Sequence, residues 1–311
     1  MNENHQITEK HIHTPSCWGC CGESETSVCI FSRNRPLQLH ALIQSLHSVR
    51  PLRDIIVLYK YDDKYLAALD EIKVLHPKIK FIEDKNFKEQ VVSFLERSGK
   101  YSMFLVDDIV FRRPVESAVY EEILDNNPQF LTFSLRMGLH LFRCYPTNTW
   151  QPIPNGSVQN NYFLWKWRAS QGDWNYPFSV DGNVFRSKQI LSWVRHLNFT
   201  APNSFEEAMC SIPTTFALPD MAICNAESSL FNNPLNRVQE THRNRSGKVT
   251  AESLLQKWDE GLEIDIDVLR THIPNGAHYV VDLPYRKRKE QPLFNFTVKD
   301  PNRIQVEVSK A

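Results

Sequence analysis

Residues 101–111 read YSMFLVDDIVF, and this stretch decides how the rest of the chain is interpreted. The apolar run Met103–Val106 predicts a buried strand. The run stops at two adjacent acids, Asp107 and Asp108, and the chain then turns apolar again at Ile109–Phe111. Buried carboxylates are costly unless a cation lies beside them. The pair therefore indicates either a site for a divalent metal ion, which prefers carboxylate oxygens, or a polar turn at the surface.

The composition describes a chain with enough apolar residues for a sizeable core and no excess charge. Of its 311 residues, 41% are hydrophobic and 11% aromatic, while Lys plus Arg and Asp plus Glu both number 36. This neutral balance gives no electrostatic reason to expect nucleic acid or a membrane surface as a partner. No apolar run approaches the ~20 residues of a membrane span, and the polar start lacks a secretory h-region. We therefore expect a cytoplasmic protein.

The first 26 residues are predicted to form a flexible leader. They contain a tight cluster, Cys17, Cys20 and Cys21, with His11 and His13 nearby. The cluster could supply half of a zinc site, but the spacing does not complete a four-ligand set. The seven cysteines of the chain are read as reduced thiols.

From Ser27 onwards, short apolar strands alternate with helical stripes. Expected strands are Ser27–Phe31, Ile55–Tyr59, Lys80–Ile82 and the strand before Asp107. Between them, apolar residues recur at helical spacing, and Pro36 suits the first turn of the first helix. Strand–helix alternation of this kind predicts an α/β fold with a doubly wound, mostly parallel sheet.

In such a sheet the carboxyl ends of the strands share one edge, where ligands bind. The polar groups that this rule brings together include Ser32, Arg33, Asn34, Arg35, Asp62, Asp63, Glu83, Asp84, Asp107 and Asp108. The first strand is followed by no glycine-rich phosphate loop. Arginine can instead grip a phosphate as a planar fork, so this edge could hold a nucleotide without glycines.

The second half of the chain has a different character. We expect strands at 130–134 and 162–167, helices at 115–124, 187–197, 204–209 and 251–258, and a mixed arrangement of short strands and loops after 217. The predicted division is a leader at 1–26, a nucleotide-binding half at 27–113, an acceptor half at 114–285 that shares the same sheet, and a tail at 286–311.

Four segments together resemble the GT-A-fold glycosyltransferases, closest in style to the inverting family 2 enzymes. They are SVCIFSRNRPLQLHALIQSL at 27–46, LVDDIVF at 105–111, SVDGNVFR at 179–186 and NSFEEAM at 203–209. The first resembles the opening strand and helix of that family and the second its acidic DxD metal motif. The third resembles its glycine-containing acceptor loop, and the fourth the acidic pair that often carries the catalytic base.

The resemblance implies a nucleotide-diphosphate sugar as donor, an acceptor hydroxyl, and Mn²⁺ or Mg²⁺ as cofactor. One departure affects the metal motif, because Val106 stands where the first acid of DxD belongs. Neighbouring side chains of a strand point to opposite faces, so Asp107 and Asp108 can face one metal only if the chain bends. We expect Asp108 to bind the metal directly. Asp107 would contact the ribose, the metal through water, or solvent.

Candidate catalytic bases are Glu206 and Glu207, although acids in a first helical turn also stabilise the helix dipole. Asp181 is a third candidate; its alternative role is an Asp-Gly turn. His242 lies in a polar loop and would be a further metal ligand by resemblance, or an ordinary surface histidine. Asp62 and Asp84 are placed to read the nucleotide base.

Two other readings stay open. A nucleotidyltransferase would need a glycine-rich, lysine-bearing turn after the first strand, which Ser32–Pro36 lacks. A catalytically silent carbohydrate-binding protein of the same fold is kept open by Val106. Trp165, Trp167 and Trp174 could stack on a sugar or belong to the core, and the basic run 286–289 is read as a solvated tail.

Overall fold

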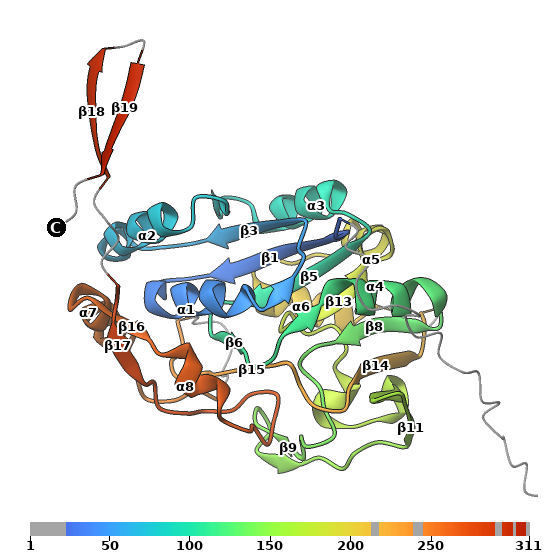
Figure 1. Ribbon diagram of the computed structural model, residues 1–311. Coiled ribbons are helices and arrows are strands. Elements are labelled where there is room, and N and C mark those ends of the chain that lie inside the picture. The colour runs from blue at the N-terminus through green and yellow to red at the C-terminus, as the bar shows by residue number, and fades with distance from the viewer. Residues whose placement is uncertain (1–22, 213–217, 239–244, 290–293, 301–302, 309–311) are drawn as a thin grey trace, which may run out of the picture.

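A computed structural model describes residues 23–212, 218–238, 245–289, 294–300 and 303–308. The fold is a mixed α/β layer structure around a nine-stranded sheet, in the order β11-β12-β14-β8-β13-β5-β1-β3-β4 (Figure 1). The cysteine cluster at 17–21 and His242 lie outside the described residues. In the part of the chain that is described, no helix has both the length and the apolar composition needed to cross a membrane.

The first half of the sheet confirms the doubly wound pattern. Strand β1 pairs in parallel with β3 on one side and with β5 on the other, and β3 pairs in parallel with β4. The elements are β1 (Thr26–Ser32), α1 (Pro36–Leu46), β3 (Asp54–Tyr59), α2 (Asp63–Leu75), β4 (Lys80–Glu83), α3 (Phe87–Arg97) and β5 (Tyr101–Val106). The carboxyl ends of all four strands therefore lie at one edge.

The second half extends the same sheet, but not in the order of the chain. Strand β13 inserts antiparallel between β5 and β8, so that β8 runs parallel to β5. Strand β14 pairs in parallel with β8, and β12 and β11 complete that end in antiparallel fashion. The elements are α4 (Ser117–Asn126), β8 (Phe130–Ser134), β11 (Gly156–Gln159), β12 (Tyr162–Lys166), β13 (Asn183–Arg186), α5 (Ser187–Val194), α6 (Pro202–Cys210) and β14 (Met221–Asn225).

Short elements surround the sheet. The paired strands are β2 (Val49–Arg50) with β7 (Val115–Glu116), β6 (Ile109–Phe111) with β15 (Leu230–Asn232), β9 (Arg143–Cys144) with β10 (Thr149–Trp150), β16 (Leu262–Ile264) with β17 (Tyr285–Lys287), and β18 (Phe294–Asp300) with β19 (Arg303–Val308). The remaining helices are α7 (Ala251–Asp259), α8 (Ile266–Arg270), η1 (Trp167–Ala169) and η2 (Gly172–Asn175). The predicted division into two halves stays a prediction.

Apolar residues fill both faces of the sheet, as a doubly wound fold requires. One core contains Leu42 of α1 and Leu69 of α2, which pack against Ile30 and other β-strand side chains. The core on the other face contains Phe94 of α3 and Phe205 of α6. The helices thus hold the sheet rigid from both sides while its carboxyl edge stays open.

The structure decides between the two alternatives for the tryptophans and corrects the expectation for the basic run. Trp165, Trp167 and Trp174 are all buried, so they belong to the core and offer no stacking surface. The basic run does not begin as a solvated tail either. Arg286 lies in β17 and donates to Glu263 at 2.7 Å, while the guanidinium of Arg288 lies 3.7 Å from the ring centroid of Trp258.

Candidate active site

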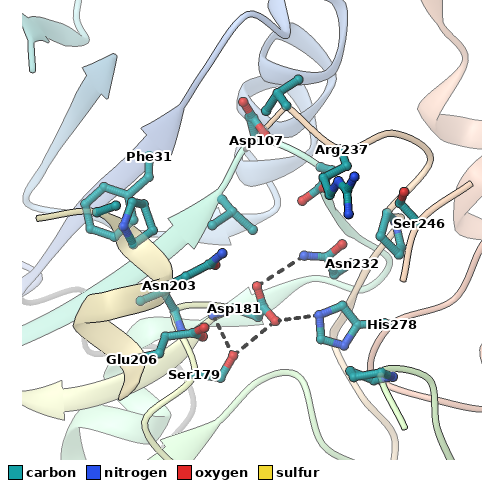
Figure 2. Close-up of a pocket in the computed structure, with 18 of the residues that line it drawn as sticks. Phe31, Asp107, Ser179, Asp181, Asn203, Glu206, Asn232, Arg237, Ser246 and His278 are labelled. Carbon is teal, nitrogen blue, oxygen red and sulfur yellow. Dashed lines mark hydrogen bonds and ion pairs between the residues drawn. The ribbon is translucent and has the colours of Figure 1, made fainter. Parts of the chain in front are cut away.

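A cavity of about 610 Å³ lies at the carboxyl edge of the sheet. It is lined from the first half of the chain by residues that follow β1, β3, β4 and β5, and from the second half by loops and by helix α6. Figure 2 shows side chains from both halves pointing into the same space. Residues that the edge rule brings together thus line one cavity, and this cavity is the candidate active site.

The acid pair at the end of β5 converges on one arginine. Arg35 Nη1 donates to Asp107 Oδ1 at 2.8 Å and to Asp108 Oδ2 at 2.9 Å. The alternation expected of a strand does not apply, because β5 ends at Val106 and residues 107–108 form a turn before β6. The same turn lets both buried carboxylates face one cation.

Asp107 is held by the turn that follows β1. It accepts hydrogen bonds from Ser32 Oγ at 2.9 Å and from the backbone N–H of Arg33 at 3.0 Å. Arg35 is itself fixed by a second bond from Nη2 to the carbonyl of Asn236. Asp107 is only 2% exposed, which excludes solvent alone among the three contacts considered for it.

Asp108 is less completely neutralised than its neighbour. Burial raises its pKa to about 6, aided by the charges of Asp107 and Asp181, although Arg35 opposes the shift. Its Oδ1 atom is buried and has no hydrogen-bond partner in the described part of the chain. An unpaired, buried carboxylate oxygen with a raised pKa is a position where a further cation would relieve a desolvation cost.

The residues of the site could supply part of the ligand set of a divalent ion, but not all of it. Among the described residues, no group of three or more His, Cys, Asp or Glu side chains could hold a metal by itself. Mg²⁺ and similar ions are often held by one or two carboxylates, with substrate phosphates and waters completing the shell. Asp108 Oδ1 suits that arrangement as the single direct protein ligand.

Of the other residues predicted for nucleotide binding, Asn34 and Asp62 bind each other. Asn34 Nδ2 donates to Asp62 Oδ2, and the Asp62 N–H donates to Asn34 Oδ1, both at 2.8 Å. Asn34 has a φ of 53°, in the left-handed region that Asn tolerates better than most residues. Neither residue lines the cavity. Their contacts instead fix the turn that carries Arg33 and Arg35.

Asp84 does line the cavity, at the end of β4. Burial raises the pKa of its carboxyl, and Lys60 nearby opposes the shift. Phe31 and Phe87 lie in the same part of the wall, with ring centroids 5.0 Å apart. This corner combines flat apolar surface with one acceptor group, which suits a nucleotide base.

Asp181 lies in the middle of the cavity wall (Figure 2). Its Oδ2 accepts from Ser179 Oγ at 3.0 Å and pairs with His278 Nε2 at 3.2 Å, while its Oδ1 accepts from Asn232 Nδ2 at 3.2 Å. Burial alone would raise the pKa of Asp181, but His278 and Arg136 outweigh it and hold the pKa below its usual value. Asp181 is therefore a fixed negative charge.

The two adjacent glutamates of helix α6 lie in different surroundings. Glu206 is partly buried, lines the cavity and accepts from the Val180 N–H at 2.8 Å. Burial and the Asp181 charge raise the pKa of Glu206 to about 7. Glu207 is exposed and does not line the cavity.

Sequence reasoning missed several residues of the site. Arg136 is 1% exposed, donates to Asp173 at 2.7 Å and lies 3.9 Å from Asp181. It follows β8, so applying the edge rule to that predicted strand would have found it. His278 and Asn232 come from distant segments that meet in a single parallel bridge, and no local signal marks them.

With this geometry in place, the chain proves similar to glycosyltransferases. One relative in sequence is the bifunctional glycosyltransferase pgtA of Dictyostelium discoideum, which is 24% identical over 213 residues. The match covers 59% of this chain and 28% of the relative, so the chain spans little more than a quarter of that protein's length. The resemblance to glycosyltransferases that the motifs indicated is thereby confirmed. No protein-family model matches the chain.

Solved structures give matches of low similarity. The Staphylococcus aureus TarS fragment 1–349 in complex with UDP has a TM-score of 0.40 and 13% identity, covering 66% of this chain and 58% of that one. The mannosyltransferase PcManGT of Pyrobaculum calidifontis, in complex with GDP-Man and Mn²⁺, has a TM-score of 0.36 and 12% identity, covering 61% and 53%.

Proposed function

We propose that the chain is a metal-dependent glycosyltransferase, which moves a sugar from a nucleotide-diphosphate donor to an acceptor hydroxyl with inversion. One observation carries the proposal. A single cavity brings together the acid turn at Asp107–Asp108 and a carboxyl group, Glu206, whose pKa is about 7. Sequence similarity to a glycosyltransferase supports the same class.

The donor would lie along the first half of the cavity. Asp84 and the adjacent aromatic rings would receive the base. Asp108 would hold a divalent ion, which supplies positive charge against the leaving diphosphate. Arg237 and Arg245 also line the cavity and would bind the phosphates, since guanidinium groups pair well with phosphate oxygens.

The base is assigned to Glu206 rather than to Asp181. A general base works best when its pKa lies near the working pH, which the Glu206 carboxyl satisfies. Asp181 is engaged by several donors and its lowered pKa makes it a poor proton acceptor. Glu206 would take the proton of the acceptor hydroxyl as its oxygen attacks the anomeric carbon. The carbon–oxygen bond to the diphosphate breaks from the opposite side, and its electron pair leaves with the diphosphate.

The test is release of nucleoside diphosphate from a panel of uridine, guanosine, cytidine and thymidine diphosphate sugars, with and without Mn²⁺. Wild type should turn over one donor class in a metal-dependent way. Glu206→Gln should lower the rate about a hundredfold or more, while donor binding, measured by thermal shift, is kept. Glu207→Gln is the matched control, because that exposed neighbour should stay close to wild type.

Other outcomes would point to a different catalytic base or to one of the alternative functions. Loss of activity in Glu207→Gln alone would move the base to the second glutamate. Nucleotide-sugar binding without turnover of any donor would support the silent carbohydrate-binding alternative. Pyrophosphate release from a nucleoside triphosphate and a sugar phosphate would support the nucleotidyltransferase alternative.

A further inference from the structure

An exposed aromatic pair lies on the hairpin formed by β9 and β10. The rings of Phe142 and Trp150 are stacked, with centroids 4.8 Å apart and planes inclined by 29°. Trp150 is 71% exposed and Phe142 39% exposed, whereas Trp165, Trp167 and Trp174 are buried. Burying a large apolar ring usually lowers the free energy, so a stacked pair that is exposed to solvent is a candidate contact surface.

The hairpin is fixed rather than loosely attached. The backbone N–H groups of Phe142 and Arg143 both donate to the carbonyl of Asn275, at 3.0 and 2.9 Å. Gln151, which follows β10, is 1% exposed, and its Oε1 accepts from the Asp173 N–H at 2.9 Å. The aromatic pair is thus held by segments on both sides, which limits the ordering cost of binding a ligand.

The same hairpin forms part of the wall of the active-site cavity. The cavity is lined by Cys144 of β9 and by Tyr145, Pro146 and Thr147 of the turn between the two strands. Arg245 contacts the turn, with its guanidinium 4.9 Å from the ring centroid of Tyr145. Two residues of extended strand span roughly 7 Å. The aromatic pair therefore lies just outside the cavity, at a distance suited to a neighbouring sugar unit.

The surroundings of the pair favour a sugar over a protein partner. Exposed polar residues of the hairpin lie near the pair, among them Arg143, Asn148 and Thr149, while Cys144 is buried. A protein-docking face would present a broader apolar core. Two flat rings within a hydrogen-bonding rim match a pyranose, which has an apolar C–H face and hydroxyl groups around its edge.

We propose that Phe142 and Trp150 form an acceptor subsite that binds a sugar ring one or two units away from the hydroxyl that reacts. The acceptor class is therefore an oligosaccharide or glycan chain rather than a free monosaccharide. The proposal rests on the function proposed above. It goes beyond that function by assigning the class of acceptor and the residues that select it.

The experiment compares Trp150→Ala with wild type, using chito-, cello-, manno- and galacto-oligosaccharides and the matching methyl monosaccharides. Binding is measured on a glycan array, and transfer by release of nucleoside diphosphate. Trp150→Ala should weaken binding of the preferred oligosaccharide and raise its KM about tenfold, the scale expected for a lost stacking contact. Its kcat, its hydrolysis of the donor by water and its KM for monosaccharides should not change.

Two further variants separate this role from a structural one. Trp150→Phe should retain most of the oligosaccharide affinity, because it keeps a flat ring. Tyr285→Ala removes another exposed aromatic side chain, 39% exposed on β17 and outside the cavity wall, and should have no effect.

The inference would be overturned if wild type binds no oligosaccharide better than its monosaccharide, or if Trp150→Ala leaves the oligosaccharide KM unchanged while donor hydrolysis persists. A dimer that dissociates in Trp150→Ala, with glycan binding intact, would also overturn it. Absence of donor hydrolysis in wild type, with glycan binding that depends on Trp150, would leave the subsite standing and refute the proposed transfer reaction instead.

Discussion

Replacing the metal-ligand candidate Asp108 by Asn should stabilise the metal-free protein at neutral and higher pH. The carboxyl is 7% exposed, and one of its oxygens has no partner among the described residues. Its pKa is raised to about 6 by burial and neighbouring charges, against about 3.9 for an unfolded Asp. The folded protein therefore disfavours ionised Asp108.

The sign and size follow from linkage. Between pH 4 and pH 6 the folded state holds the proton more tightly than the unfolded state, so stability falls as the pH rises. At about 1.36 kcal/mol per pKa unit, a shift of roughly two units removes about 3 kcal/mol by pH 7. Asn resembles the protonated acid but leaves an unpaired amide, which costs about 1 kcal/mol or more. A net gain of about 1–2 kcal/mol is expected at pH 8, and none at pH 4.

The assay is urea unfolding of wild type and Asp108→Asn across this pH range, with a chelator present. Asp181 has the opposite shift, so it contributes stability that is lost at low pH, but it is common to both proteins and cancels in the difference. Asp220→Asn, at an exposed position, is the control and should give a difference near zero at every pH.

A stability difference that does not vary with pH, or an Asn variant less stable than wild type at pH 8, would refute this account of Asp108. Adding Mn²⁺ and the donor's nucleoside diphosphate should reverse the order. Wild type gains binding free energy from both ligands, whereas the variant loses the carboxylate that the ion requires.

Two further substitutions probe the acceptor side of the cavity. Asp181→Asn removes a charge that raises the pKa of Glu206, so the pH midpoint of the transfer rate should move to lower pH; an unchanged midpoint would contradict this coupling. Gly182 has a φ of +85°, and a Cβ there would lie 2.4 Å from Leu230 Cδ2. Gly182→Ala should therefore cost about 1–3 kcal/mol in urea unfolding, whereas Gly261→Ala, also at positive φ but with no atom within 4 Å, should cost less.

The local pattern of apolar residues was sufficient to predict the first half of the fold. The parallel strands β1, β3, β4 and β5 and the helices between them follow from apolar periodicity and from Pro36, which begins α1. Topology then placed the acid turn beside Ser32–Arg35 without any knowledge of contacts. These predictions succeeded because parallel strands joined by helices leave few alternatives for which edge their ends share.

The sequence pattern did not predict contacts between segments that lie far apart in the chain. Nothing in the sequence indicates that β13 inserts between β5 and β8, or that this insertion brings Asp181 to the same edge as Asp108. The partners of individual side chains could not be predicted from the sequence either. Arg35 was expected to grip a phosphate, yet its guanidinium is committed to the acid pair, because two buried carboxylates without a cation would be far more costly.

The roles assigned to the three central carboxylates depend on how many donors each receives, not on residue type. Asp181 is met by Ser179, Asn232 and His278 and stays ionised. Asp108 receives a single donor from Arg35, and Glu206 receives the Val180 N–H and the Ser179 hydroxyl, which are too few to outweigh burial at either carboxyl. Because the Asp181 charge also raises both of those pKa values, one fixed anion prepares the donor side to accept a cation and the acceptor side to accept a proton.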